Sequence, residues 1–327
     1  NCRGEKILIS FSDPRGFICH EEIITAGITA TPEGPAATVK LSLKEDAGNY
    51  IIESGPNIFR FDKQKGTLSC NSDGDEIITR GGEFMLVYFN NDDGGAPNIA
   101  NNGYTQDIRP LEYGPVTNYK PLKINALVES DGSVHVNVTG IVENIIGGKQ
   151  EYVFTSSGTM QVSYDYVALA DFKGKDRLRQ FGILFTFPRS FDKLNWERKG
   201  LWTSYPGNDI SRIEGSASAS QRDLEYVEEP RVVQSGSWKD NANKLGTNDF
   251  RSTKGNIIRA SLTNYKNREG TVRSDGTQSA RAWVDGENIR FLIAGMNGPG
   301  SCGFFTGPRP EFTAGDHLMG DFVFHLK

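Results

Sequence analysis

Short stretches of alternating apolar and polar residues, each bounded by glycine or proline, run through nearly the whole chain. The stretch EKILISFSDPRGFICHEEIITAG (5–27) alternates on both sides of residues 13–16, which predicts a β-hairpin. The 37 glycines and 14 prolines supply turns between the strands. No amphipathic helix of about 12 or more residues is predicted, and the best candidate, 222–230, ends at Pro230. The sequence therefore predicts an all-β fold of the sandwich type.

The first 45 residues differ in organisation from the rest. The opening hairpin is followed by ATPEGPAATVKLSLKEDAGNY (30–50), which is rich in proline, glycine and alanine. A lone hairpin is marginally stable in water, because two strands cannot bury a face. We therefore expect residues 1–45 to be the tail of a domain whose beginning is missing. Residues 46–327 are expected to form one large β unit or a closely packed pair of sheets.

Composition excludes several classes of protein. The 327 residues are 37% hydrophobic and 24% charged, which is enough apolar material for a globular core. The net charge is −5 with no long run of one sign, whereas nucleic-acid binders carry a basic stripe. No stretch approaches the ~18 apolar residues of a membrane span. We expect neither a nucleic-acid nor a membrane partner.

The cysteines and histidines indicate no metal or cofactor. Cys2, Cys19, Cys70 and Cys302 form no CxxC pair and are expected to be buried or free thiols. The four histidines include none beside a serine or cysteine in a nucleophile motif, and GxSxG is absent. Carboxylates abound, but no pair stands at the strand ends of a barrel, as a glycosidase needs. No catalytic residue is predicted, and no cofactor is expected.

Two stretches could contact a ligand. FNNDDGGAPN (89–98) offers hard oxygen donors at Asn91, Asp92 and Asp93, but it lacks EF-hand spacing, so a solvated Asx-rich loop is favoured over a calcium site. WERKGLWTSYPGNDISRIEG (196–215) gathers Trp196, Trp202 and Tyr205 beside a turn. These rings either stack on sugar rings or pack a corner of the sandwich.

The segment RQFGILFTFPRSFDKLNWERKGLWTSYPGNDISRIEG (179–215) resembles the final domain of glycoside hydrolase family 2 β-galactosidases. Gly182 and Pro188 fit the family's strand, and the family's second signature is fitted by Trp196, Gly200, Tyr205, Pro206 and Arg212. The chain departs from the family at Arg198, Lys199, Leu201 and Thr203. Trp202 lies inside the same segment, and we group it with Trp196, Tyr205 and Arg212 as the fold signature.

Other stretches are similar to the same family in the same order. NYIIESGPNIFRFDKQKGTL (49–68) resembles the opening strands of that domain, and AGMNGPGSCGFFTGPRPEF (294–312) its closing active-site loop. The opening hairpin resembles the last strands of the Ig-like domain that precedes it. The resemblance implies a large galactose-mutarotase-like β-sandwich (supersandwich) from about residue 46 onward, preceded by the tail of an Ig-like sandwich.

The resemblance also implies a role. A separate (β/α)8 barrel carries the catalytic glutamates of the whole enzymes, and this chain lacks the strand–helix alternation of a barrel. The final domain instead supplies a wall of the sugar pocket. Cys302, with Ser301 and Gly300, stands at the tip of the closing loop. Asn91, Asp92 and Asp93 match the family's acidic loop, although its Arg-Ala-Pro part is absent.

Three hypotheses follow. The favoured one is the C-terminal region of a β-galactosidase-like hydrolase, inactive alone, whose partners are a β-galactoside or related glycan and the rest of the parent enzyme or a barrel-bearing chain. The second is a free-standing carbohydrate-binding module or the small subunit of a two-chain glycosidase. A mutarotase-type enzyme is the least favoured, because no acid–base pair supports it. We favour a fragment, since a stand-alone module would not begin halfway through a domain. We expect the parent protein to be periplasmic or secreted.

Overall fold

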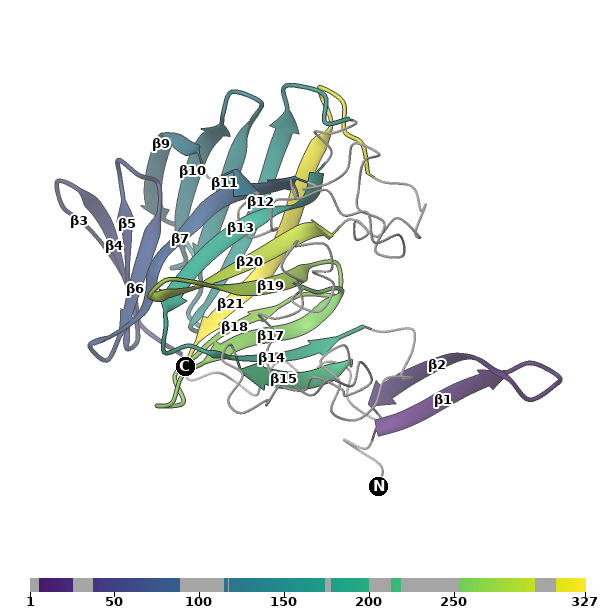
Figure 1. The fold of residues 1–327 in the computed structure, drawn as a ribbon. Helices are drawn as coiled ribbons and strands as arrows, with labels where there is room; N and C mark the ends of the chain where they lie inside the picture. Colours follow the sequence, from purple (N-terminus) through teal and green to yellow (C-terminus); the bar gives the residue numbers. More distant parts are fainter. Residues whose placement is uncertain are drawn as a thin grey trace.

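The computed structural model describes residues 6–25, 38–88, 115–116, 118–173, 178–199, 213–218, 253–297 and 310–327. In these residues the chain forms strands β1 to β21 and no α-helix (Figure 1). No helix that is long and apolar enough to cross a bilayer occurs in these ranges. The predicted all-β class is confirmed.

Two large antiparallel sheets make up the sandwich (Figure 1). The ten-stranded sheet contains, in spatial order, β16 (Thr253–Lys254), β19 (Ser279–Asp285), β20 (Asn288–Asn297), β13 (Leu178–Pro188), β7 (Asp75–Tyr88), β6 (Leu68–Ser72), β5 (Asn57–Asp62), β4 (Asn49–Ser54) and β3 (Leu41–Glu45), and β8 (Pro115–Val116) also pairs with β7. The nine-stranded sheet contains β15 (Glu214–Ser218), β14 (Lys193–Arg198), β17 (Ile257–Thr263), β18 (Glu269–Arg273), β21 (His317–Leu326), β12 (Thr159–Ala168), β11 (Ile146–Phe154), β10 (Val134–Val142) and β9 (Tyr119–Val128).

The main core lies between these two sheets. Alternate residues of each strand face it: on β10, Val134, Val136 and Val138 are buried, and the residues between them are half-buried. Aromatic rings join the sheets, with Phe84 of β7 stacked on Tyr166 of β12 at 3.9 Å between ring centroids. The burial of β10 thus follows the period-two alternation of its sequence.

A second, smaller apolar cluster lies on the opposite face of the ten-stranded sheet. On β7, Phe84 and Leu86 belong to the main core, whereas the alternate residues Met85 and Val87 do not. We call this side of the sheet the outer face. The outer apolar cluster consists of Met85, Val87, Leu184, Trp283, Leu292 and Ala294. All of its members are buried, so the central strands β7, β13 and β20 are apolar on both faces.

The opening hairpin forms a sheet of its own from β1 (Lys6–Ser12) and β2 (Ile18–Thr25). Asp13 shapes its turn by accepting hydrogen bonds from the amides of Arg15 and Phe17, at 2.8 and 3.0 Å. Its large apolar side chains, Ile7, Leu8, Phe11, Phe17 and Ile18, are between 42% and 66% exposed. The hairpin by itself therefore leaves its apolar surface in contact with solvent.

Residues that the sequence assigned to the linker belong to the sandwich. β3 pairs with β4 along its whole length, from Leu41 opposite Ser54 to Glu45 opposite Tyr50. The amide of Val39 donates to the carbonyl of Ser156, at 2.8 Å. The sandwich consequently begins before residue 46, because these hydrogen bonds join residues 39–45 to it.

Candidate functional site

The residues expected to border a sugar pocket lie outside the described ranges. They are Asn91, Asp92, Asp93, Gly300, Ser301 and Cys302, and the same holds for the signature residues Trp202, Tyr205 and Arg212. Their roles stay predictions. The described strands nevertheless fix where the chain enters the two predicted pocket segments.

Both pocket segments follow the ends of central strands at the same end of the ten-stranded sheet, where β13 begins. β7 ends at Tyr88, shortly before Asn91, and Tyr88 pairs with Leu178 at the start of β13. β20 ends at Asn297, shortly before Gly300, and Asn297 pairs with Gln180 of the same strand. Because β7 and β20 flank β13 and neighbouring strands lie about 4.8 Å apart, the two strand ends are roughly 10 Å apart across the sheet.

A polar network, largely buried, holds the C-terminal end of β20 against the start of β13. The amide nitrogen of the Gln180 side chain donates to Asn297 Oδ1 at 3.0 Å and to Thr253 Oγ1 at 3.2 Å. Arg281 Nη1 donates to Gln180 Oε1 at 3.5 Å, and the Arg281 guanidinium lies 4.7 Å from the ring centroid of Trp283. Gln180, Thr253 and Arg281 are buried, whereas Asn297 is exposed, so the network is shielded from water within the sheet and reaches the surface at the strand end.

Trp196 packs inside the sandwich. Its side chain is 5% exposed and belongs to the main core. A Cβ atom built on Gly215 would lie 2.4 Å from Trp196 Cζ2, so the ring covers a position where only glycine fits. The ammonium of the buried Lys254 lies 4.6 Å from the ring centroid of Trp196, which suits a cation–π contact. A ring enclosed in this way has a packing role and is not free to stack on a sugar.

Two carboxylates face each other at an edge of the nine-stranded sheet. Glu197 of β14 lies directly opposite Glu214 of β15, and both residues are exposed. Directly opposed residues project to the same face, with Cβ atoms about 5 Å apart. Arg259 lies opposite Glu197 on the other side, and its guanidinium binds Glu269. Both glutamates line an open hollow beside Trp196 and Arg259, and their exposure to solvent differs from the enclosed acid of a glycosidase pocket.

Ser133, His135 and Glu151 form a hydrogen-bonded chain that the sequence did not predict. His135 Nδ1 lies 2.9 Å from Glu151 Oε1, and His135 Nε2 lies 3.1 Å from Ser133 Oγ. The Ser133 hydroxyl, however, donates its single proton to Asp131 Oδ1 at 2.6 Å. The hydrogen bonds from Ser133 lower the pKa of Asp131. Because the Ser133 hydroxyl donates its hydrogen bond to Asp131, it does not donate to His135, and His135 does not act as a base toward Ser133 in this arrangement.

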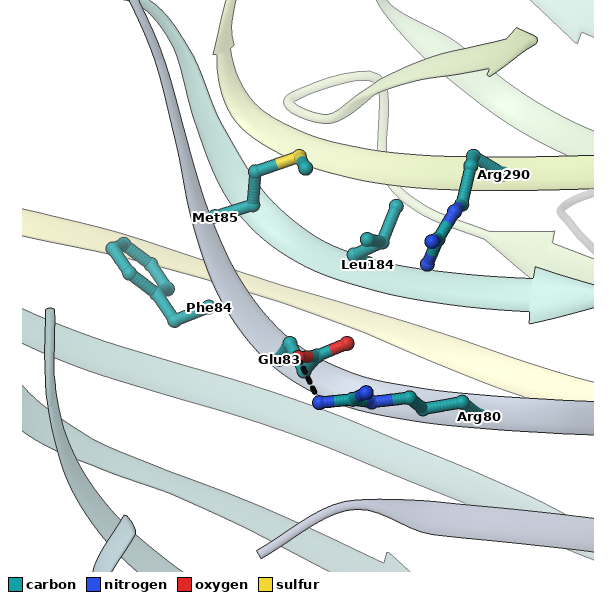
Figure 2. A pocket seen from close by; sticks show the side chains of 6 residues that line it. All are labelled: Arg80, Glu83, Phe84, Met85, Leu184 and Arg290. Carbon is teal, nitrogen blue, oxygen red and sulfur yellow. Dashed lines mark hydrogen bonds and ion pairs between the residues drawn. The ribbon is translucent and has the colours of Figure 1, made fainter. Parts of the chain in front are cut away.

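A third group of polar residues lines a hollow on the outer face of the ten-stranded sheet (Figure 2). Glu83 of β7 is 8% exposed and forms an ion pair with Arg80, with 2.6 Å between Oε1 and Nη2. Burial raises the pKa of Glu83, and the positive charges of Arg80 and Arg290 oppose that shift. Within the described residues, no group of three or more His, Cys, Asp or Glu side chains could hold a metal ion.

Comparison with solved structures gives low similarity. A proposed aldose 1-epimerase of Escherichia coli K12 is 10% identical, with a TM-score of 0.39, over 88% of this chain and 99% of that one. A glycoside hydrolase family 97 enzyme from Pseudoalteromonas sp. strain K8, solved with panose, is 9% identical, with a TM-score of 0.37, over 88% of this chain and 35% of that one. The periplasmic domain of Thermotoga maritima YidC is 11% identical, with a TM-score of 0.31, over 87% of this chain and 85% of that one.

Likeness at this level carries no argument about function. No curated protein sequence matches the chain at a significant level. Residues 54–269, which are 216 of the 327 residues, match the family described as beta galactosidase small chain. This match runs from β4 to the start of β18 and thus spans strands of both large sheets. The chain therefore belongs to the β-galactosidase small-chain family.

Proposed function

We propose that this chain is the non-catalytic, C-terminal portion of a β-galactosidase-like glycoside hydrolase of family 2. It packs on a (β/α)8 barrel that carries the catalytic glutamates and completes the barrel's sugar pocket. The assembled enzyme hydrolyses terminal, non-reducing β-galactosides. The observation that carries this proposal is the family match, which spans 216 of the 327 residues.

The arrangement of the strand ends supports a pocket role. β7 ends at Tyr88 and β20 ends at Asn297, and both strand ends lie beside the start of β13. The two predicted pocket segments therefore follow from the same end of the ten-stranded sheet. The hydrogen bonds of Gln180 hold these strand ends in place, and a fixed end of the sheet is suited to form one wall of a substrate pocket shared with another domain. Cys302, at the tip of the closing loop, presents a small polarisable group to the sugar.

The opening hairpin supports attachment to more protein. We propose that it is the end of an Ig-like domain, because its exposed apolar side chains need a covering surface that two strands do not supply.

The family description "small chain" favours a second arrangement, in which this chain is the small subunit of a two-chain glycosidase. Both arrangements require a barrel-bearing partner.

Replacing Cys302 tests the pocket role directly. In the assembled enzyme, Cys302→Ala should lower kcat/KM for 4-nitrophenyl β-D-galactopyranoside about tenfold, the equivalent of ~1.4 kcal/mol of transition-state binding. The melting temperature should change by less than about 2 °C, because the substitution removes a single sulfur atom and changes no charge. Cys19→Ala, in the opening hairpin, is the matched control and should leave kcat/KM unchanged. Equal values for wild type and Cys302→Ala would remove Cys302 from the pocket.

A further inference from the structure

The hollow on the outer face lies across three neighbouring strands, β7, β13 and β20 (Figure 2). Its volume is about 180 Å³, and it is lined by Arg80, Glu83, Phe84, Met85, Leu184 and Arg290. Pockets for drug-sized ligands occupy roughly 300–1,000 Å³. This hollow is therefore large enough for one small ring and too small for an extended chain.

A β-bulge interrupts β7 between two residues that line the hollow, Arg80 and Glu83. Leu184 and Phe185 of β13 are consecutive, but they pair with Glu83 and Gly81, so Gly82 is the extra residue. Gly82 has a φ of +86°, and a Cβ there would lie 2.5 Å from the Tyr152 hydroxyl. The Gly82 carbonyl accepts a hydrogen bond from the side chain of the buried Gln150 at 2.5 Å. The core thus holds the bulge, which places Arg80 on the same outer face as Glu83, although the two residues are three apart.

The charges around the hollow are balanced. Arg80 is paired with Glu83, and Arg290 Nε donates to Asp285 Oδ2 at 2.8 Å. Arg290 Nη1 also donates to Thr186 Oγ1 at 2.8 Å. Two guanidinium groups therefore face two carboxylates, so the site has no surplus positive charge for a phosphate or sulfate. It does offer directed donors and an acceptor within one small space.

Glu83 retains capacity to accept hydrogen bonds. Its Oε1 binds Arg80, and its second oxygen has no hydrogen-bond partner among the described residues. Figure 2 shows the Glu83 carboxylate and the Arg290 guanidinium pointing into the same space from β7 and β20. An ionised carboxylate that is nearly buried is costly unless its remaining acceptor sites are filled, and burial raises the pKa of Glu83 accordingly.

The floor of the hollow is apolar. Met85 and Leu184 belong to the outer apolar cluster and lie beside Glu83. The Arg80 side chain is 51% exposed, so the hollow opens to solvent on its side. An apolar floor beneath directed donors and an acceptor suits a ring that has hydroxyl groups at its rim and C–H groups on its face.

We propose that this hollow binds a single neutral sugar ring, with Glu83 accepting hydrogen bonds from its hydroxyls, Arg80 and Arg290 donating to them, and Met85 and Leu184 contacting its C–H face. The inference extends beyond the pocket wall proposed above, because every residue of this binding site belongs to this chain. It needs neither the barrel nor the Cys302 loop. Its failure would leave the proposed function intact, and failure of the proposed function would leave this site intact.

The test is a titration of the 327-residue chain, without any barrel, with methyl β-D-galactopyranoside and methyl β-D-glucopyranoside, followed by NMR shifts or calorimetry. We expect a dissociation constant in the millimolar range for at least one of the two sugars. Glu83→Gln, which keeps the shape of the side chain, should raise that constant at least tenfold. Glu76→Gln is the matched control on the same strand, and its exposed side chain should change the constant less than twofold.

Arg80→Lys provides a second variant, because it keeps a positive charge beside the nearly buried Glu83 and removes the directed guanidinium donors. It should weaken sugar binding at least threefold. Sodium sulfate is the competing probe and should bind more weakly than the sugar. No binding of either sugar at 100 mM, tighter binding of sulfate, or equal sugar affinity in Glu83→Gln and wild type would each overturn the assignment.

Discussion

The 327-residue chain on its own is expected to hydrolyse 4-nitrophenyl β-D-galactopyranoside no faster than about tenfold above the uncatalysed rate. Glycosidases need two carboxylates on either side of the scissile bond, one of them a proton donor with a raised pKa. Such sites supply rate enhancements of at least ~10⁶-fold. The opposed pair in the described strands, Glu197 and Glu214, is exposed at a sheet edge and lacks the enclosure that makes a carboxyl an acid at neutral pH.

Colorimetric assay of the purified chain measures this directly. The matched variants are Glu197→Gln and Glu214→Gln, which remove one charge each from an exposed position. Background activity that is the same in all three proteins is the expected result. Turnover well above background that is lost in either variant would locate acid–base chemistry within this chain and contradict the proposed non-catalytic role.

Replacement of Trp196 by alanine should lower the free energy of unfolding by about 3–5 kcal/mol, because it leaves a large cavity in the main core. The ring fills the space beside Gly215 and contacts the ammonium of Lys254. Its loss therefore also removes the cation–π interaction that stabilises this buried cation. Urea denaturation of the full chain, followed by tryptophan fluorescence and circular dichroism, gives the value.

Tyr265→Ala is the matched control for this experiment. Tyr265 is 79% exposed, in the turn after β17, and its loss should change stability by less than ~0.5 kcal/mol. A change below about 1 kcal/mol for Trp196→Ala would mean that the ring is accessible. That result would restore the sugar-stacking interpretation of the aromatic stretch.

The sequence predicted the strands well, because burial on one face of a sheet imposes a period of two. β10 shows this most plainly, with valine at alternate positions. The outer apolar cluster was not predicted. The runs FMLV in β7 and FLIA in β20 are apolar at successive positions, so their alternation is lost, and the sequence does not tell which residues face which side.

The polar clusters around His135 and Glu83 could not be predicted from the sequence. They form only in one register of strand pairing, and the spacing of residues along the chain does not determine that register. Ser133, directly before β10, and His135 within it are two residues apart, but Glu151 joins them because β11 pairs with β10 in one register. The Glu83 hollow had a weak signal in the two glycines that precede Glu83, since glycine inside a strand often marks a bulge. The partner Arg290 lies far along the chain and reaches the hollow only through the pairing of β13 with both β7 and β20.

The central claim is that this chain completes a barrel-bearing β-galactosidase, and one measurement tests it most directly. Galactoside hydrolysis is assayed for the barrel-bearing polypeptide of the proposed parent enzyme, first alone and then with increasing amounts of the 327-residue chain. The account predicts that hydrolysis rises at least a hundredfold, saturates at one chain per barrel, and that the two polypeptides sediment as one complex. A barrel that is fully active alone, with no binding to this chain, would contradict the account.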